Sequence, residues 1–518
     1  MFPKFPMHAL AGLFLLAAPH AAANIFVTNT FNAGPGSLRD AILQANAFPG
    51  PDIICFAIPG PGPHTIQPTS ALPALTDFFG TIIDGYTQPG STPGVTPPAT
   101  AVIMIEIDGQ FAGAANGLLI QSDANIVQGL AINRFQLDGI KIEGGAFFPP
   151  TANFNLIYAN YVGTDPSGSS DLGNGTNTSG LRGGIHVGNV AGGSADGNTI
   201  DRNLVSGNYA DGVWIQGPFQ PGTVSANFVT SNFVGTDRSG LVDLGNDHEG
   251  IALTEGTVAN QILTNLVSGN DFDGIGLQGF SNEGFPQPPI QTSFNTIQGN
   301  TVGLDILGNP LPNLYHGITL GTYGPSTWGC ADANSVLQNT IAFNGRDGIC
   351  VFEDGVDNIN ADHNLISENS IHGNLGLGID LDDNGVTRNN PLDLDDGANQ
   401  ELNYPVPTQA TYAGGQVVIQ GTLDIDTPPE TALVEVFKAA PDPSGHGEGQ
   451  VFVGATIPDS MGNWTLTTAL LAPGEHVTAT ATDLAANTSE FGPTLRIRRV
   501  RAGLGDCTGC PTLLRSHP

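Results

Sequence analysis

The sequence predicts an all-β fold, a single-stranded parallel β-helix in which short strands are wound into stacked coils. A tetrad of glycine, an apolar residue, any residue and a second apolar residue recurs at intervals of 22 to 45 residues. A repeat of this period is typical of a solenoid, whose units bury their apolar faces against one another. The tetrads begin at Gly117, Gly139, Gly184, Gly212, Gly250, Gly274, Gly317, Gly348 and Gly378.

Asparagines mark the corners of the predicted coils. Ahead of one tetrad, Asn198, Asn203 and Asn208 follow one another at a spacing of five residues. Asparagine and glycine favour sharp turns, so three short strands with these residues at the corners predict a β-helix. An asparagine pair with this spacing precedes each of the last seven tetrads, starting at Asn155, Asn203, Asn227, Asn265, Asn295, Asn339 and Asn364.

These tetrads and asparagine pairs resemble the repeats of the pectin-lyase-like superfamily of parallel β-helix proteins. The resemblance covers residues 116–380 and implies a right-handed coil, the usual hand of parallel crossovers. The superfamily includes polysaccharide lyases, glycosidases, epimerases, phage tailspikes and adhesins. The resemblance therefore implies the fold without selecting one activity.

The segments before the repeats have separate predicted roles. Residues 1–23 combine an apolar run with a triplet of small residues, which predicts a secretory signal peptide. Residues 24–115 contain irregular early coils and a short helix that Ser37 opens, with an apolar stripe of Leu38, Ile42 and Leu43. We expect this helix to be an N-terminal cap, because the open end of a solenoid exposes unpaired backbone and core.

The repeats occupy residues 116–385, and the pattern of apolar and polar residues changes after them. An acidic linker follows at 386–407. Alternating strands separated by turns then predict a β-sandwich at 408–497, and its ending resembles bacterial Ig-like domains. A basic tail occupies residues 498–518.

The charge of the chain limits its partners. It carries 48 acidic against 15 basic residues, with a pI near 4.2, so we expect no binding to nucleic acid. After the signal segment, no apolar run reaches the ~20 residues that span a bilayer, so we expect no transmembrane segment. We expect a secreted or cell-surface protein whose acidic surface suits neutral or cationic partners or calcium, and whose sequence shows no organic-cofactor fingerprint.

A row of outward-facing residues is the first candidate site. The residue between the two apolar positions of each tetrad points outward, and neighbouring coils lie ~4.8 Å apart. This brings Lys141, His186 and Trp214 together. Elimination from a uronate needs a base beside a cation, so Lys141 and His186 are candidate catalytic residues. The alternative is an outward face with miscellaneous polar residues.

Three acidic residues just before successive tetrads are the second candidate site. Asp211, Glu249 and Asp273 would stack ~5 Å apart, or ~10 Å where a coil is skipped. These separations bracket those of the two carboxyl groups in retaining and inverting glycosidases. The alternatives are that an acidic residue before glycine only closes a tight corner, or that calcium lies between coils.

Aromatic residues in the loops after the tetrads predict a ligand surface next to Trp214. Flat aromatic rings that line a groove are what sugar rings stack on. The alternative is that they pack the loops onto the coils. With Trp214, the candidate ligand-binding residues are Phe219, Phe280, Phe285, Tyr323 and Trp328.

Two further features predict a metal site and a disulfide. Carboxylates are dense where the repeats end, so we expect either structural calcium there or a solvated acidic loop. The candidate ligands are Asp380, Asp382, Asn384, Asp393 and Asp395. In the oxidising setting outside the cytoplasm, Cys330 and Cys350 can form a disulfide, because the loop of the first leads back to the coil of the second.

Two functions fit these features. The first is a secreted or surface-displayed β-helix that binds an extended ligand, with a polysaccharide as the expected partner, as an adhesin or matrix element. The second is a polysaccharide lyase or glycoside hydrolase that acts in a groove beside the same residues. We favour binding, because the sequence contains no complete catalytic motif and a fold hosts many activities.

Overall fold

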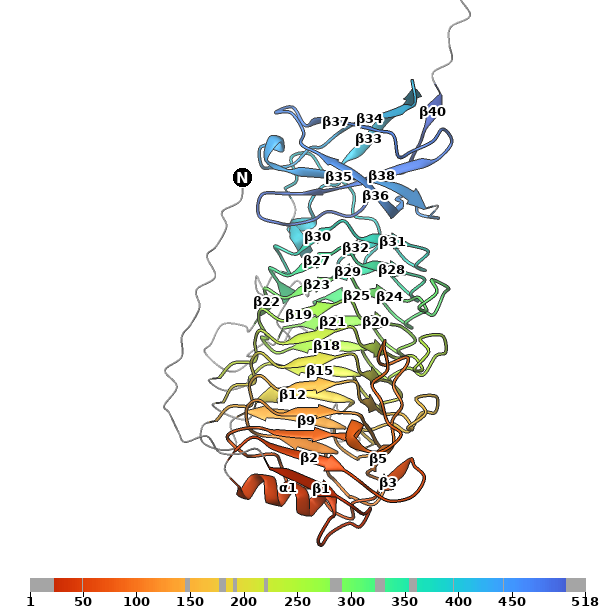
Figure 1. Cartoon of the computed structure of the whole chain (residues 1–518). Helices are drawn as coiled ribbons and strands as arrows, with labels where there is room; N and C mark the ends of the chain where they lie inside the picture. Colours follow the sequence, from red (N-terminus) through yellow and green to blue (C-terminus); the bar gives the residue numbers. More distant parts are fainter. Residues whose placement is uncertain are drawn as a thin grey trace, which may run out of the picture.

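The computed structural model describes residues 23–499 apart from 49, 145–149, 177–182, 190–192, 219–221, 280–290, 322–330, 354–360, 395 and 441. These residues form a long rod of stacked coils, with a smaller group of sheets beyond its last coil (Figure 1). Three sheets of 11, 10 and 9 strands run along the rod, and their strands pair in parallel. The predicted parallel β-helix is therefore confirmed, since each coil adds a strand to each sheet.

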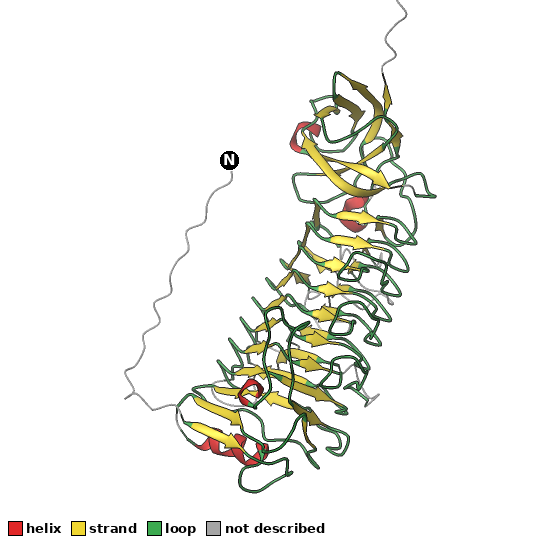
Figure 2. Cartoon of the chain, turned by 45° about the vertical axis from the view of Figure 1, so that its right-hand side comes forward, coloured by secondary structure: helices red, strands yellow, loops and turns green. Residues whose placement is uncertain are grey.

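The first two sheets form two sides of the rod (Figure 2). The 11-stranded sheet contains β1 (Asn24–Val27), β2 (Asp52–Phe56), β4 (Thr81–Asp84), β7 (Ile126–Gln128), β10 (Leu156–Tyr158), β13 (Thr199–Asp201), β16 (Phe228–Thr230), β19 (Gln261–Leu263), β23 (Thr296–Gln298), β27 (Ser335–Leu337) and β30 (Leu365–Ser367). The 10-stranded sheet contains β3 (His64–Ile66), β5 (Ile105–Asp108), β8 (Leu130–Asn133), β11 (Tyr161–Val162), β14 (Leu204–Val205), β17 (Phe233–Val234), β20 (Leu266–Val267), β24 (Thr301–Val302), β28 (Thr340–Ala342) and β31 (Ser370–His372).

The tetrads form the 9-stranded sheet, and a two-stranded sheet of β22 (Thr292–Ser293) and β26 (Ala331–Asp332) lies outside the three long ones. In each tetrad the two apolar side chains are buried in the core. Glycine is needed at the first position because a Cβ on Gly212 would lie 2.6 Å from the carbonyl oxygen of Gly250. The strands are β6 (Leu118–Ile120), β9 (Ile140–Gly144), β12 (Ile185–Asn189), β15 (Val213–Gln216), β18 (Ile251–Thr254), β21 (Ile275–Gln278), β25 (Ile318–Leu320), β29 (Ile349–Val351) and β32 (Ile379–Leu381).

Each of the three corners holds a buried ladder of asparagines. At nearly every step the backbone N–H and the side-chain amide of one asparagine both donate to the Oδ1 of the next. The asparagine pairs predicted from the sequence are not all equivalent. The pairs that start at Asn203, Asn265 and Asn339 connect the second ladder to the third, whereas the other four connect the first ladder to the second. The ladders are Asn125, 155, 198, 227, 260, 295, 334, 364 and 399; Asn160, 203, 232, 265, 300, 339 and 369; and Asn174, 208, 246, 270, 313, 344 and 374.

The predicted N-terminal helix is α1 (Leu38–Ala47), the one α-helix of the described residues, and it lies at the first coil (Figure 1). Its N-cap is Ser37, whose hydroxyl accepts from the Asp40 N–H at 3.2 Å. Leu38 and Ile42 are buried, but the predicted stripe is wrong about Leu43, which is 53% exposed because it points away from the coil. None of the described helices has the length and apolarity needed to cross a membrane. The short 3-10 turns are η1 (Gly85–Thr87), η2 (Ala398–Glu401) and η3 (Pro429–Thr431).

Two four-stranded sheets cover the last coil. Their strands are β33 (Val406–Ala413), β34 (Gln416–Thr422), β37 (Asn463–Thr468) and β40 (Arg498–Arg499) in one, and β35 (Leu433–Ala440), β36 (Glu448–Thr456), β38 (His476–Thr482) and β39 (Leu495–Arg496) in the other. Phe437 and Phe491 pack into the apolar core of the rod. Buried carboxyl groups of Glu435, Glu448 and Glu490 accept backbone N–H groups of the last coil. They thus satisfy donors that a terminal coil leaves unpaired.

Candidate functional site

The outer face of the 9-stranded sheet carries the first candidate site. Strand pairing places His186 opposite Lys141 on one side and opposite Trp214 on the other, so the predicted stacking is confirmed. The imidazole of His186 stacks on the indole of Trp214, with ring centroids 4.3 Å apart and an interplanar angle of 20°. We call this row of outward residues the outward row. It continues through Ala252, Gly276, Thr319, Cys350 and Asp380.

Cross-coil bonds hold the polar groups of the outward row in place. His186 Nδ1 lies 3.2 Å from Asp138 Oδ2, and its Nε2 lies 3.0 Å from Gln216 Oε1. The indole N–H of Trp214 donates to Thr254 Oγ1 at 2.8 Å. Lys141 Nζ forms a 3.0 Å ion pair with Glu143. Lys141 is therefore engaged by Glu143, and this contact suits ligand binding better than proton abstraction.

A second group of side chains, the His248 cluster, lies at the adjacent corner. His248 Nδ1 is 2.7 Å from Asp211 Oδ1 and also contacts Glu249 Oε2. Asp211 and Glu249 are buried, whereas the side chain of His248 is 33% exposed. Gln278 donates to the other Glu249 oxygen at 2.9 Å. Two of the three predicted carboxylates are thus brought together around an imidazole that the sequence interpretation did not include.

The protonation of the His248 cluster follows from its burial. Burial acts to lower the pKa of His248, but the hydrogen bonds and charges of Asp211 and Glu249 outweigh it and raise the pKa. Burial and then the charge of Asp211 raise the pKa of Glu249 well above its ordinary value. Both shifts favour the protonated forms of His248 and Glu249.

Asp273 does not join the other two carboxylates. Its Oδ1 accepts the backbone N–H of His316 at 2.9 Å, and its Oδ2 accepts the hydroxyl of Thr319 at 2.8 Å. Burial raises its pKa, although His316 and Thr319 act against this. Asp273 thus bonds the corner and strand of the next coil, and the proposed roles of the acidic row stay predictions.

His248 also starts an aromatic stack that runs along the rod. Its ring stacks on Phe272 at 5.0 Å, and Phe272 packs on Tyr315 at 4.4 Å. The guanidinium of Arg346 lies 4.7 Å from the centroid of Tyr315. All four residues stand two positions after an asparagine of the third ladder, so the sequence signal was present once the correct register was known.

Comparison with known proteins adds little about function. No protein-family model matches the chain. The A-module of mannuronan C-5 epimerase AlgE6 from Azotobacter vinelandii is similar with a TM-score of 0.43 and 14% identity, over 69% of this chain and 78% of that one. The AlgE4 A-module of the same organism gives 0.39 and 14% over 70% and 82%, and ORF18 of Geobacillus virus E2 gives 0.39 and 11% over 91% and 76%. The three long parallel sheets themselves give the chain a pectin-lyase-like parallel β-helix fold.

The loop aromatics cannot be compared with the prediction. Phe219, Phe280, Phe285, Tyr323 and Trp328 lie outside the described residues. Trp214 is the described member of the predicted set and is half-buried on the outward row. A sugar-binding role for the others stays a prediction.

The predicted calcium ligands bond to different parts of the backbone. Asp380 accepts the N–H groups of Asn384 and Gly385. Asp382 accepts the N–H of Glu353 at 3.0 Å, and Asp393 that of Asn403 at 2.9 Å. Asp395 lies outside the described residues. Calcium at this end of the repeats stays a prediction.

Cys350 is fully buried on the outward row, while Cys330 lies outside the described residues. The disulfide between them therefore stays a prediction. Three described side chains that can bind a metal gather around Cys350: His316, Asp347 and Asp383.

Proposed function

We propose that the protein binds an extended polysaccharide along the outer face of the 9-stranded sheet. The indole of Trp214 carries this proposal. One face of the ring stacks on His186, and the other is directed towards the next coil, where the outward row continues with Ala252 and Gly276. No large side chain of the row covers that second face. An indole face beside small residues is a site on which a sugar ring stacks.

The polar groups around Trp214 favour a polymer over a single sugar. Gln216, Thr254 and Gln278 lie at equivalent positions of successive coils, and each side chain is held by a hydrogen bond. Fixed polar groups with a repeat of ~4.8 Å match a ligand whose hydroxyl groups also repeat, at a low entropic cost. With a net charge of −33, the chain favours a neutral over a polyanionic polysaccharide.

Replacing Trp214 with alanine tests this proposal. We expect the purified protein to bind a neutral polysaccharide in affinity electrophoresis and calorimetry. We expect the W214A variant to bind about fivefold or more weakly, since a stacked aromatic contributes ~1 kcal/mol or more. Phe294, an exposed ring at a corner of the 11-stranded sheet, provides the control F294A, which should retain full affinity. Equal affinity of the wild type and W214A would rule out this surface.

The His248 cluster favours a second function, hydrolysis of the bound glycan. Glycosidases pair a protonated carboxylic acid with a carboxylate, and the raised pKa of Glu249, which lies beside Asp211, suits the acid of such a pair. His248, which contacts both carboxyl groups, is half-buried and partly accessible to solvent. Lys141 and His186, the predicted bases for elimination, are both engaged by carboxylates. Hydrolysis is therefore better supported than elimination.

Replacing Glu249 with glutamine tests hydrolysis. If Glu249 is the acid, the wild type releases reducing ends from the polysaccharide it binds, and E249Q loses this release while it retains binding. Because only the protonated carboxyl group donates, activity should fall as the pH rises through the raised pKa of Glu249. The absence of new reducing ends with the wild type would leave binding as the function.

We also infer the setting in which this binding takes place. The apolar N-terminal segment supports secretion after cleavage of a signal peptide at residues 1–23. Helix α1 acts as the N-terminal cap of the rod, whose coils are right-handed. The two C-terminal sheets form an Ig-like domain. Secretion is tested by the N-terminal sequence of the extracellular protein, which should begin at Asn24.

A further inference from the structure

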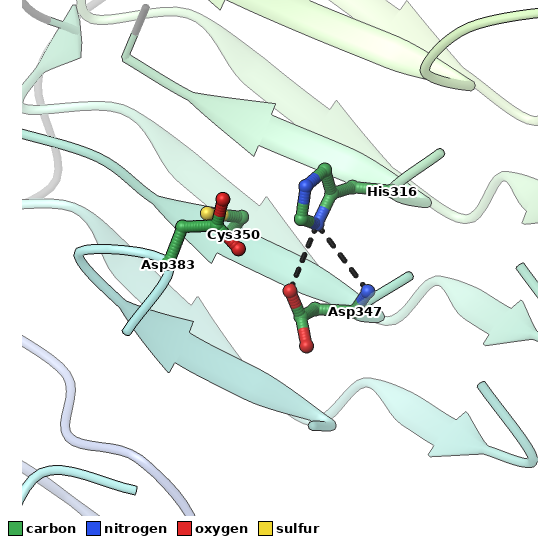
Figure 3. A group of neighbouring side chains, drawn as sticks. All are labelled: His316, Asp347, Cys350 and Asp383. Carbon is green, nitrogen blue, oxygen red and sulfur yellow. Dashed lines mark hydrogen bonds and ion pairs between the residues drawn. The ribbon is translucent and has the colours of Figure 1, made fainter. Parts of the chain in front are cut away.

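A group of potential metal ligands lies along the outward row, apart from Trp214 and the His248 cluster. It consists of His316, Asp347, Cys350 and Asp383, and we call it the Cys350 cluster (Figure 3). One ligand atom of each residue lies within 4.8 Å of those of the others: a His316 ring nitrogen, the Cys350 Sγ and a carboxylate oxygen of each aspartate. His316, Asp347 and Cys350 are buried, and Asp383 is more accessible.

The stacking of coils brings these four residues together. His316 and Asp347 stand just before the tetrads of successive coils, and Cys350 is the outward residue of β29. Asp383 follows β32 in the next coil. The cluster is therefore built from three rigid, adjacent coils, as a specific metal site requires.

Carboxyl groups outnumber the basic side chains around the Cys350 thiol. Asp273, Asp347 and Asp380 are buried, and with Asp383 they act on the thiol electrostatically. His316 Nδ1 lies 3.0 Å from Asp347 Oδ2, and Arg346 Nη1 lies 3.4 Å from Asp383 Oδ2. The Cys350 sulfur is completely buried beside these groups. Buried negative charge of this kind is stabilised by a bound cation.

We propose that the Cys350 cluster binds a divalent transition-metal ion, with Zn²⁺ as the best match. Thiolate, imidazole and two carboxylates complete the four-coordinate, tetrahedral set that zinc prefers, whereas calcium and magnesium take oxygen ligands. With metal–ligand bonds of ~2.0–2.3 Å, the donor atoms of a tetrahedral site lie about 3.5 Å from one another. The distances between the four ligand atoms, which reach up to 4.8 Å, therefore need to shorten by about 1 Å. Asp383 can supply this movement because its side chain is on an accessible turn.

Binding changes the protonation of one ligand. The thiol of Cys350 loses its proton to solvent as the sulfur–metal bond forms. His316 binds the ion through Nδ1, in place of the backbone N–H of Asp347 that this atom accepts at 3.3 Å. The site excludes a disulfide between Cys330 and Cys350, because one sulfur cannot serve both. Metal binding at the Cys350 cluster does not depend on polysaccharide binding.

Cobalt(II) provides a direct probe, since it replaces zinc and reports thiolate ligation by an intense near-ultraviolet charge-transfer band. The full-length mature protein is treated with chelator, dialysed and titrated with Co²⁺. We expect one ion per chain, the thiolate band, the visible bands of tetrahedral cobalt and displacement by Zn²⁺. The C350S variant should lose the thiolate band, and D383N, on an accessible turn, should weaken binding without affecting folding.

Two matched variants separate this site from the rest of the chain. C55S removes the other buried described cysteine, and H248Q alters the other group of candidate metal ligands. Both should retain the thiolate band. The proposal is overturned if the wild type binds no Co²⁺, if the thiolate band is missing or survives in C350S, or if peptide mapping finds Cys350 in a disulfide with Cys330.

Discussion

Replacing Asn265 with leucine should lower the free energy of unfolding by about 3–5 kcal/mol. Asn265 is buried in the middle of the second ladder. Its Oδ1 accepts both the backbone N–H and the side-chain amide of Asn232, and its own amide donates to Val229 O and Asn300 Oδ1. Leucine has a similar size but leaves these partners without hydrogen bonds in the interior. Urea unfolding followed by circular dichroism measures the loss.

Two further variants show whether hydrogen bonds, and not shape, cause that loss. N265D keeps the acceptor but removes the donor, so it should be unstable at neutral pH and recover partly in acid, where the protonated carboxyl group donates again. Q298L changes an amide whose bond to Gln338 is exposed, and should cost less than about 0.5 kcal/mol. If N265L lowered the free energy of unfolding as little as Q298L does, the hydrogen bonds of the ladders would not be what stabilises the rod.

Replacing Glu448 with alanine should weaken the closure of the rod by a comparable amount, about 3–5 kcal/mol. The buried carboxylate accepts the backbone N–H and the side-chain amide of Asn374 at 3.0 and 2.9 Å, and also the N–H of Gly373. Asn374 is the last member of the third ladder. Removal of Glu448 therefore leaves the end of that ladder unpaired. Limited proteolysis and the melting temperature report the opening of the last coil.

The pH dependence of this closure has a defined sign. Burial raises the pKa of Glu448, and it raises that of Glu490 to about 8. A carboxyl group whose pKa is higher in the folded state contributes stability fully below its unfolded pKa, and this is lost as the pH rises through the folded value. Stability of the wild type should therefore fall from about pH 5 to 8. E490Q should be less stable than the wild type at pH 5 and show a flatter pH profile; an unchanged profile would contradict the assignment.

Much of the rod could be predicted because equivalent positions in successive repeats identify the residues that pair in neighbouring coils. The tetrads fixed which strands pair, and therefore that Lys141, His186 and Trp214 are neighbours. The register of the asparagines was harder, since three ladders with the same five-residue spacing allow a pair to be assigned to the wrong corners. His248 was missed for the same reason. The sequence shows that His248, Phe272, Tyr315 and Arg346 have equivalent positions only after the asparagines of the third ladder have been aligned.

The chemistry of the site was less predictable because it depends on side-chain directions. Asp211, Glu249 and Asp273 have equivalent positions in sequence, but Asp273 bonds to Thr319, whereas no hydroxyl stands at the matching positions beside the other two, Ala252 and Gly276. Leu43 follows the helical pattern yet faces outward. Three of the predicted calcium ligands, Asp380, Asp382 and Asp393, bond to separate parts of the backbone. Spacing alone carries none of this information.

The central proposal is that a glycan lies against Trp214 on the outer face of the 9-stranded sheet. Oxidative footprinting by mass spectrometry, with and without a saturating amount of the polysaccharide that binds best, measures this directly. We expect oxidation of Trp214 to fall several-fold, while the exposed rings of Phe154 and Phe294, on another side of the rod, remain equally reactive. Unchanged oxidation of Trp214, or protection confined to the C-terminal sheets, would contradict the proposal.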